Sequence, residues 1–153
     1  MCLQIAPAVT FSAVAIALLI AHQVADHWVQ SSHQAMHKGL PGWCGRRACA
    51  AHVFGYTITT TIAVVAVVIA LHLPVSPAQI MLGQAVSAVT HYWADRRTTL
   101  GKLARLAGKG EFYALGAPRT GHNDNPSLGT GAYALDQSWH WAWLGVAALV
   151  TAL

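Results

Sequence analysis

Two long stretches without a charged side chain constrain this chain more than any other feature. No Asp, Glu, Lys or Arg occurs in residues 1–25 or in residues 48–94. Only 9% of all residues are charged and 55% are hydrophobic, whereas a typical soluble domain has about 25% charged residues. A soluble domain of 153 residues has too little interior to bury so much apolar surface. We therefore expect one compact unit that resides in a lipid bilayer.

The apolar stretches divide into helices that are long enough to cross a membrane. About 20 apolar residues cross the hydrocarbon core as a helix. Residues 48–94 are too many for one crossing, and Pro74 and Pro77 divide them in two. The expected fold is all-α, a single-domain polytopic membrane protein with four transmembrane helices at residues 5–30, 48–72, 77–95 and 131–153.

The positive charges predict how the helices are oriented. With four spans, both segments that carry Lys and Arg lie on the same side of the membrane, whereas three spans would separate them. The positive-inside rule places these segments in the cytoplasm and both termini outside. The six Trp residues map to the same side, as expected for an interfacial belt. The nine basic residues are Lys38, Arg46, Arg47, Arg96, Arg97, Lys102, Arg105, Lys109 and Arg119.

The connecting segments carry fewer signals. In residues 98–107, leucines recur every three positions against Lys102 and Arg105, which predicts a short amphipathic helix on the membrane surface. Residues 108–131 are rich in Gly, Pro, Asn and Asp, which favours an ordered loop or lid, with disorder as the alternative. The three cysteines are irregularly spaced, and we expect free thiols.

The strongest chemical signal is the spacing between Asp and His. Three of the four Asp residues have a His four positions away, far more often than nine randomly placed His residues would give. Four positions are a little over one helical turn, so each pair projects from one face of its helix. The pairs are His22 with Asp26, His91 with Asp95, and Asp136 with His140.

The expected topology brings these pairs to one depth. Each pair lies in the cytoplasmic half of its span, and His52 lies in the first turns of the second span. Ionisable residues within spans are costly and normally face the bundle interior. Imidazole and carboxylate suit Zn²⁺, with Mn²⁺ or Fe as alternatives, and two carboxylates can bridge a second ion. We predict a site for one or two divalent transition metal ions, with the ligands His22, Asp26, His52, His91, Asp95, Asp136 and His140.

A metal at this site would polarise an acyl or phosphoryl oxygen and activate water. His52, as ligand or general base, and Asp95 are the residues we expect to act in catalysis. Gln30, Gln137 and Tyr56 are expected to hydrogen-bond to the ligands. Three alternatives stay open: a proton or ion pathway, a metal that only clamps the helices, and structural polar packing. The apolar outer halves of the spans disfavour a continuous polar path.

Several polar residues fall outside this prediction. Lys38, Arg96 and Arg97 can attract an anionic headgroup, although anchoring the topology is the simpler role. The remaining histidines lack a paired Asp and are left out of the site, with His37 the first that would be added. They are His27, His33, His37, His72 and His122.

The order of these motifs resembles a known family. The motifs are His22-x3-Asp26-x3-Gln30, Lys38, His52-x3-Tyr56, His91-x3-Asp95 and Asp136-Gln137-x2-His140, and they cover nearly the whole chain. This arrangement resembles an uncharacterised family of small multi-span membrane proteins of bacteria and their phages. It is distantly similar to inner-membrane proteins described as metal-dependent hydrolases.

The resemblance implies a location in the bacterial inner membrane and a metal-binding, hydrolytic role for the seven predicted ligands. We therefore expect a membrane-embedded metal-dependent hydrolase that acts on a lipid or a lipid-linked ester or phosphoester at the cytoplasmic leaflet. The lipid bilayer is the expected partner and nucleic acid is not. Whether the chain forms an oligomer stays open.

Overall fold

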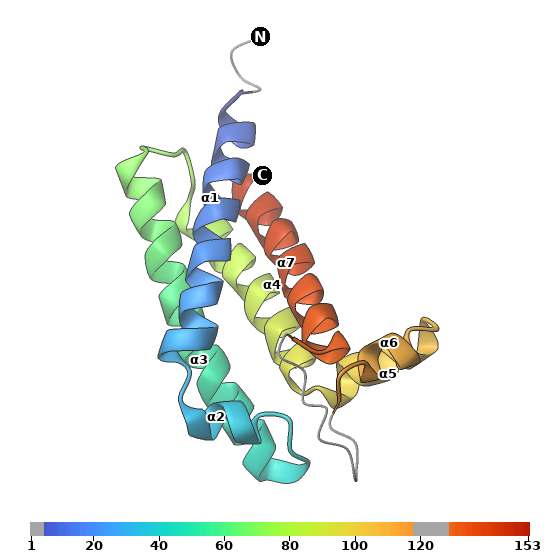
Figure 1. Ribbon diagram of the computed structural model, residues 1–153. Coiled ribbons are helices and arrows are strands. Elements are labelled where there is room, and N and C mark those ends of the chain that lie inside the picture. Colours follow the sequence, from blue (N-terminus) through green and yellow to red (C-terminus); the bar gives the residue numbers. More distant parts are fainter. Residues whose placement is uncertain (1–4, 118–128) are drawn as a thin grey trace.

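A bundle of four long helices forms the body of the protein (Figure 1). The computed structural model describes residues 5–117 and 129–153, and these ranges contain helices and no strand. Successive long helices run in opposite directions, and each packs against two others. The all-α prediction is therefore confirmed. The long helices are α1 (Ile5–Val24), α3 (Gly42–Ala70), α4 (Pro77–Asp95) and α7 (Gly131–Ala152).

Three short helices lie at the end of the bundle away from the chain termini (Figure 1). One of them, α5 (Thr98–Leu106), is the surface helix predicted at residues 98–107. The other two lie in segments that we expected to be loops: α2 (Ser32–His37) and α6 (Gly110–Ala114). Of the predicted loop at 108–131, residues 118–128 lie outside the described part.

The first long helix changes its winding before it ends. Its last turn, η2 (Ala25–Val29), is π-helical, and the backbone N–H of Gln30 donates to the carbonyl of Ala25 at 2.9 Å. Such turns are rare and often occur at functional sites. This one carries Asp26, so the altered winding sets the direction of a predicted ligand.

Two of the described helices are long and apolar enough to cross a membrane. They are Ile5–Val29, with 25 residues, and Gly42–Ala70, with 29 residues. The other two expected spans, α4 and α7, are not among them. Their polar side chains explain this result, because α4 carries Gln84, Ser87 and His91 and α7 carries Asp136 and His140. By length and composition alone, two of the four predicted spans qualify as membrane-crossing helices.

Helices α4 and α7 pack closely at Gly83. A Cβ atom at this position would lie 2.9 Å from the carbonyl oxygen of Ala147 and would overlap the hydroxyl of Thr151. Small residues at such crossings let two helix backbones pack at short distance. The absence of a side chain at Gly83 therefore lets α4 and α7, which each carry a ligand pair, pack directly against each other.

Basic residues gather at the end of the bundle that carries the short helices (Figure 1). They occupy α5, the first turns of α3, and the segments that follow α2, follow α4 and precede α6, so they share one end of the bundle. Arg119 lies outside the described residues. The eight described ones are Lys38, Arg46, Arg47, Arg96, Arg97, Lys102, Arg105 and Lys109.

The tryptophans divide into two groups, so an interfacial belt describes only some of them. Trp28, Trp43 and Trp141 are exposed. The others stack on one another: the ring centroids of Trp93 and Trp139 are 4.5 Å apart, and those of Trp139 and Trp143 are 5.8 Å apart. This stack packs α4 against α7.

Candidate metal centre

All seven predicted ligands meet in the bundle interior, in the half nearer the basic end. Their side chains come from α1, η2, α3, α4 and α7. The five most buried are at most 3% exposed, whereas the side chain of Asp136 is 26% exposed. Those five are His22, His52, His91, Asp95 and His140.

Four of these residues approach one another closely in the middle of the cluster. The Nε2 atoms of His52 and His91 are 3.0 Å apart. Asp95 Oδ2 lies 3.2 Å from both nitrogens. Asp26 Oδ1 lies 3.3 Å from that of His52 and 3.6 Å from that of His91. Ligands about 2.0–2.1 Å from a tetrahedral zinc lie about 3.3–3.4 Å from one another, so the atoms of His52, His91 and Asp95 are close to the spacing of three ligands of one such site.

The amide of Gln30 faces both His52 and Lys38. With its oxygen facing the donors, this amide accepts a hydrogen bond from Lys38 Nζ at 2.9 Å, and the same oxygen lies 3.0 Å from His52 Nδ1 and 3.2 Å from His52 Nε2. A neutral imidazole that donated through Nδ1 would keep its lone pair on Nε2, toward His91 and Asp95. Metal-ligating histidines commonly donate their other N–H in this way.

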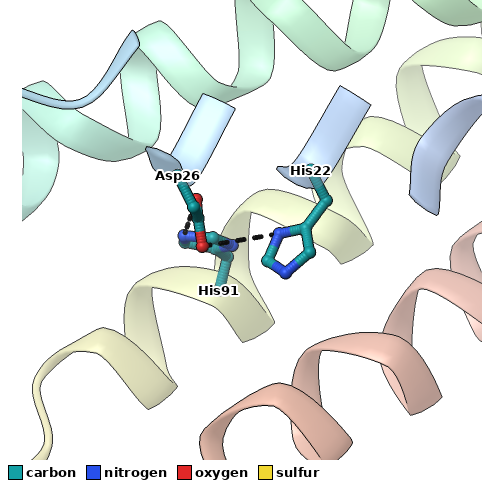
Figure 2. A group of neighbouring side chains, drawn as sticks. All are labelled: His22, Asp26 and His91. Carbon is teal, nitrogen blue, oxygen red and sulfur yellow. Dashed lines mark ion pairs between the residues drawn. The ribbon is translucent and has the colours of Figure 1, made fainter. Parts of the chain in front are cut away.

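Asp26 and Asp95 also reach toward the remaining ligands. Figure 2 shows Asp26 between two imidazoles, with one carboxylate oxygen toward His91 and the other, Oδ2, 3.5 Å from His22 Nδ1. Asp95 Oδ1 lies 3.8 Å from His140 Nε2, which is 3.9 Å from Asp136 Oδ2. Three overlapping groups of His and Asp can thus hold a metal ion: the first two share His91, and the last two share Asp95.

Several buried polar atoms of this cluster have no hydrogen-bond partner among the described residues. They include both ring nitrogens of His22 and of His140, together with Asp26 Oδ1 and Asp95 Oδ2. An unpaired buried polar atom costs about 1–3 kcal/mol, so native structures rarely leave them together. A bound cation would satisfy these atoms, and their donor chemistry of imidazole and carboxylate fits a divalent transition metal.

A buried lysine belongs to the cluster as well. Lys38 Nζ lies 2.9 Å from Asp95 Oδ1, and the residue is 9% exposed. Sequence reasoning placed this lysine beside the site as an anchor or a headgroup contact and missed the ion pair. Three carboxylates and one ammonium leave two negative charges in the cluster, the charge that one divalent cation would neutralise.

The other predicted partners of the ligands differ in what they contact. Tyr56 stacks on His91 with ring centroids 3.9 Å apart, while its hydroxyl bonds to Ser87 Oγ at 2.6 Å. Gln137 Nε2 donates to Asp136 Oδ2 at 3.4 Å. Tyr56 therefore orients a ligand by stacking and Gln137 by hydrogen bonding.

The histidines that were left out of the prediction do not reach the cluster. His33 and His37 stack on each other along α2. His27 is exposed and bonds to the backbone of Gln23, and His72 lies in the turn after α3. His122 lies outside the described residues, as does Cys2, while Cys44 and Cys49 are free.

A polar chamber adjoins the cluster on the side of the basic end. Its volume is about 410 Å³, and all three carboxylates of the cluster line it. Two predicted headgroup contacts, Lys38 and Arg97, line it as well. Arg96 instead donates to backbone carbonyls of Lys38 and Leu40, so its role is structural. Sequence reasoning missed Tyr113 and Tyr133, which complete the wall beside Gln30 and Gln137.

Comparison with known proteins places the chain in a family. No curated protein and no solved structure matches it. Residues 14–153 match the family described as Protein of unknown function (DUF3307), and this range contains every residue of the cluster. The family match does not indicate that the chain is a hydrolase, and it does not indicate that the chain is a membrane protein. Because it covers most of the sequence, the chain belongs to the DUF3307 family.

Proposed function

We propose that this protein is a membrane-embedded zinc-dependent hydrolase that acts on a lipid or a lipid-linked ester or phosphoester at the cytoplasmic leaflet. The close spacing of His52, His91 and Asp95, with Asp26 beside the two imidazoles and a polar chamber next to them, is the observation that carries the proposal. A compact group of imidazole and carboxylate ligands suits Zn²⁺ better than Mn²⁺ or Fe, which favour higher coordination numbers.

Residence of all four long helices in lipid is part of the proposal. Large apolar side chains are exposed on each of them, for example Ile16 on α1, Ile62 on α3, Met81 on α4 and Leu149 on α7. Extensive exposed apolar surface is unfavourable in water. The polar residues of α4 and α7 that lower their hydropathy turn inward, so these helices still present an apolar face to lipid.

The residues of the cluster differ in burial, and this difference gives the two parts of the cluster different roles. His52, His91 and Asp95 form a buried group that would hold one ion away from solvent. An ion held by Asp95, Asp136 and His140 would lie beside the chamber, which both carboxylates line, so we assign the hydrolytic metal to this second group. A bound metal ion would supply Lewis acidity at this position. Lys38, which lines the chamber beside Asp95, is placed to hold developing negative charge on the substrate.

Metal analysis of the purified protein tests this proposal. We expect about two zinc ions per chain, and one in Asp136→Asn, because the group of His52, His91 and Asp95 does not include this residue. The exposed His33→Gln, which lies outside the chamber, is the matched control and should keep both ions. Hydrolysis of a panel of lipid esters and phosphoesters should require the second ion. Protein without stoichiometric transition metal would overturn the proposal, and one ion with no hydrolysis would indicate a helix clamp.

A second candidate function is favoured by a column of buried polar side chains. Beyond the cluster, Thr60 Oγ1 donates to Gln84 Oε1 at 2.7 Å, next to the pair formed by Tyr56 and Ser87. Thr151 is also buried. The outer half of the interior is therefore less apolar than the sequence suggested, and hydroxyl chains can carry protons. Proton flux in liposomes that disappears in Gln84→Leu would favour transport over hydrolysis.

A further inference from the structure

A second, apolar hollow lies on the surface beside the chamber. Its volume is about 510 Å³, and residues of α1 and α7 line it. Leu19, Ile20 and Trp141 supply exposed apolar walls. Their mixture of aliphatic and aromatic surface suits an alkyl chain.

Two residues line both the chamber and the apolar hollow. They are Tyr133 and Gln137, four positions apart on α7. Gln23 of α1 also lines the hollow, and its amide donates to Gln137 Oε1 at 3.3 Å. Gln137 in turn donates to Asp136. Hydrogen bonds therefore lead from the apolar hollow directly to a carboxylate of the metal centre.

Positive charge lines the chamber on the side of α2 and α5. Besides Lys38, the chamber wall includes Arg97, whose Nη2 donates to the carbonyl of Ala35 at 3.1 Å. Arg97 has a φ of 53°, a conformation that is costly for a residue other than glycine. The planar guanidinium still has donors left for other partners, and its fork geometry matches a phosphate.

From the continuity of these two hollows we infer that the substrate is an anionic phospholipid that enters sideways between α1 and α7. Its phosphate lies in the chamber near Arg97, and one acyl chain lies in the apolar hollow against Trp141. A free phosphate would leave the hollow empty, and an uncharged lipid would leave Arg97 without an anion. This inference rests on the proposed function and specifies its substrate class.

Quenching of tryptophan fluorescence by brominated lipids tests the inference. Metal-loaded protein is reconstituted in phosphatidylcholine vesicles with a small fraction of brominated phosphatidic acid or, separately, of brominated phosphatidylcholine. The contribution of Trp141 is the difference between the unmodified protein and Trp141→Phe. We expect Trp141 to be quenched preferentially by phosphatidic acid, and this preference to fall about tenfold in Arg97→Gln, since a charge-assisted hydrogen bond is lost. Arg105→Gln, an exposed residue of α5 outside the chamber, is the control.

Equal quenching of Trp141 by the two lipids would overturn the inference, because the hollow would then be ordinary lipid-facing surface. A preference that persists in Arg97→Gln would overturn the assignment of the phosphate to the chamber. Metal content is measured on the same samples. Preferential quenching in protein that proves unable to retain metal would support lipid binding while rejecting the hydrolase, so the two failures are distinguishable.

Discussion

Asp95 is the residue on which the largest number of site contacts converge. Its two oxygens contact Lys38, His52, His91 and His140 at 2.9–3.8 Å. Sequence spacing could predict that Asp95 pairs with His91, since both lie on one helix. It could not predict Lys38, whose position depends on a short helix with no apolar periodicity.

Replacement of Asp95 separates metal binding from charge compensation. In Asp95→Asn we expect loss of the metal held by His52, His91 and Asp95 and a loss of about 3–5 kcal/mol in the free energy of unfolding of metal-free protein, because buried Lys38 loses its counter-ion. The double variant Lys38→Met/Asp95→Asn should recover most of that stability and still bind no metal at this position. Unfolding in mixed micelles and metal analysis measure the two effects. Equal stability of the single variant and the unmodified protein would contradict the ion pair.

Gln30 offers a test of how a neighbouring residue tunes a ligand. Gln30→Leu removes the acceptor for His52 Nδ1–H, so we expect zinc affinity to fall about 10–100-fold while the fold persists. Gln30→Glu keeps an acceptor oxygen and should retain most of the affinity. Competition with a zinc-binding dye measures both variants. If leucine and glutamate weakened zinc binding equally, the hydrogen bond to His52 would not be the cause.

At the scale of elements, the sequence predicted the long helices and missed the features that aim the site. Hydrophobic runs and prolines place the ends of α4 and α7 correctly. The π-helical turn η2 leaves no periodic signal in five residues, since it differs from an α-helix only by one shifted hydrogen bond. Helix α2 is six residues long, and a capping box between Ser31 and Gln34 stabilises its first turn. This local signal is not visible in the pattern of apolar residues.

The crossing of α4 and α7 gives a prediction at this scale. Gly83→Val should force the two helices apart, because the new side chain would overlap Ala147 and Thr151. We expect a loss of about 1–3 kcal/mol or more in unfolding free energy and reduced occupancy of the ion position at His140 and Asp136. Gly145→Val is the matched control, since no atom lies within 4 Å of a Cβ at that glycine of α7. Similar melting temperatures for the two variants would contradict close packing at Gly83.

At the scale of the whole molecule, the antiparallel arrangement of the helices brings residues that are far apart in the sequence close together. Ligands 118 positions apart, His22 and His140, have ring centroids 5.1 Å apart because antiparallel helices return to the same depth. The sequence predicted that convergence from charge placement and helix direction. It could not predict the chamber, whose walls combine side chains of η2 and α7 with side chains of the short helices and the segments beside them.

Cysteine labelling tests the orientation of the whole bundle. With four spans, Cys44 in a variant with Cys2 replaced by Ser should react with a membrane-impermeant maleimide only from the cytoplasmic side, and so should Lys102→Cys with Cys2 and Cys44 replaced by Ser. Pro74→Cys and Leu153→Cys, each with Cys2 and Cys44 replaced by Ser, should react only from the other side. If only α1 and α3 crossed the membrane, position 102 would react on the same side as position 74. Comparing intact cells with inverted vesicles therefore separates four spans from two.

The partly exposed side chain of Asp136 also bears on how the protein is supplied with metal. It is the point at which an otherwise buried cluster meets solvent, and it lies toward the basic end of the bundle. In the proposed orientation, ions would load from the cytoplasm alone, after insertion into the membrane. The availability of free zinc in that compartment, and not its concentration in the growth medium, would then govern how much of the protein is active.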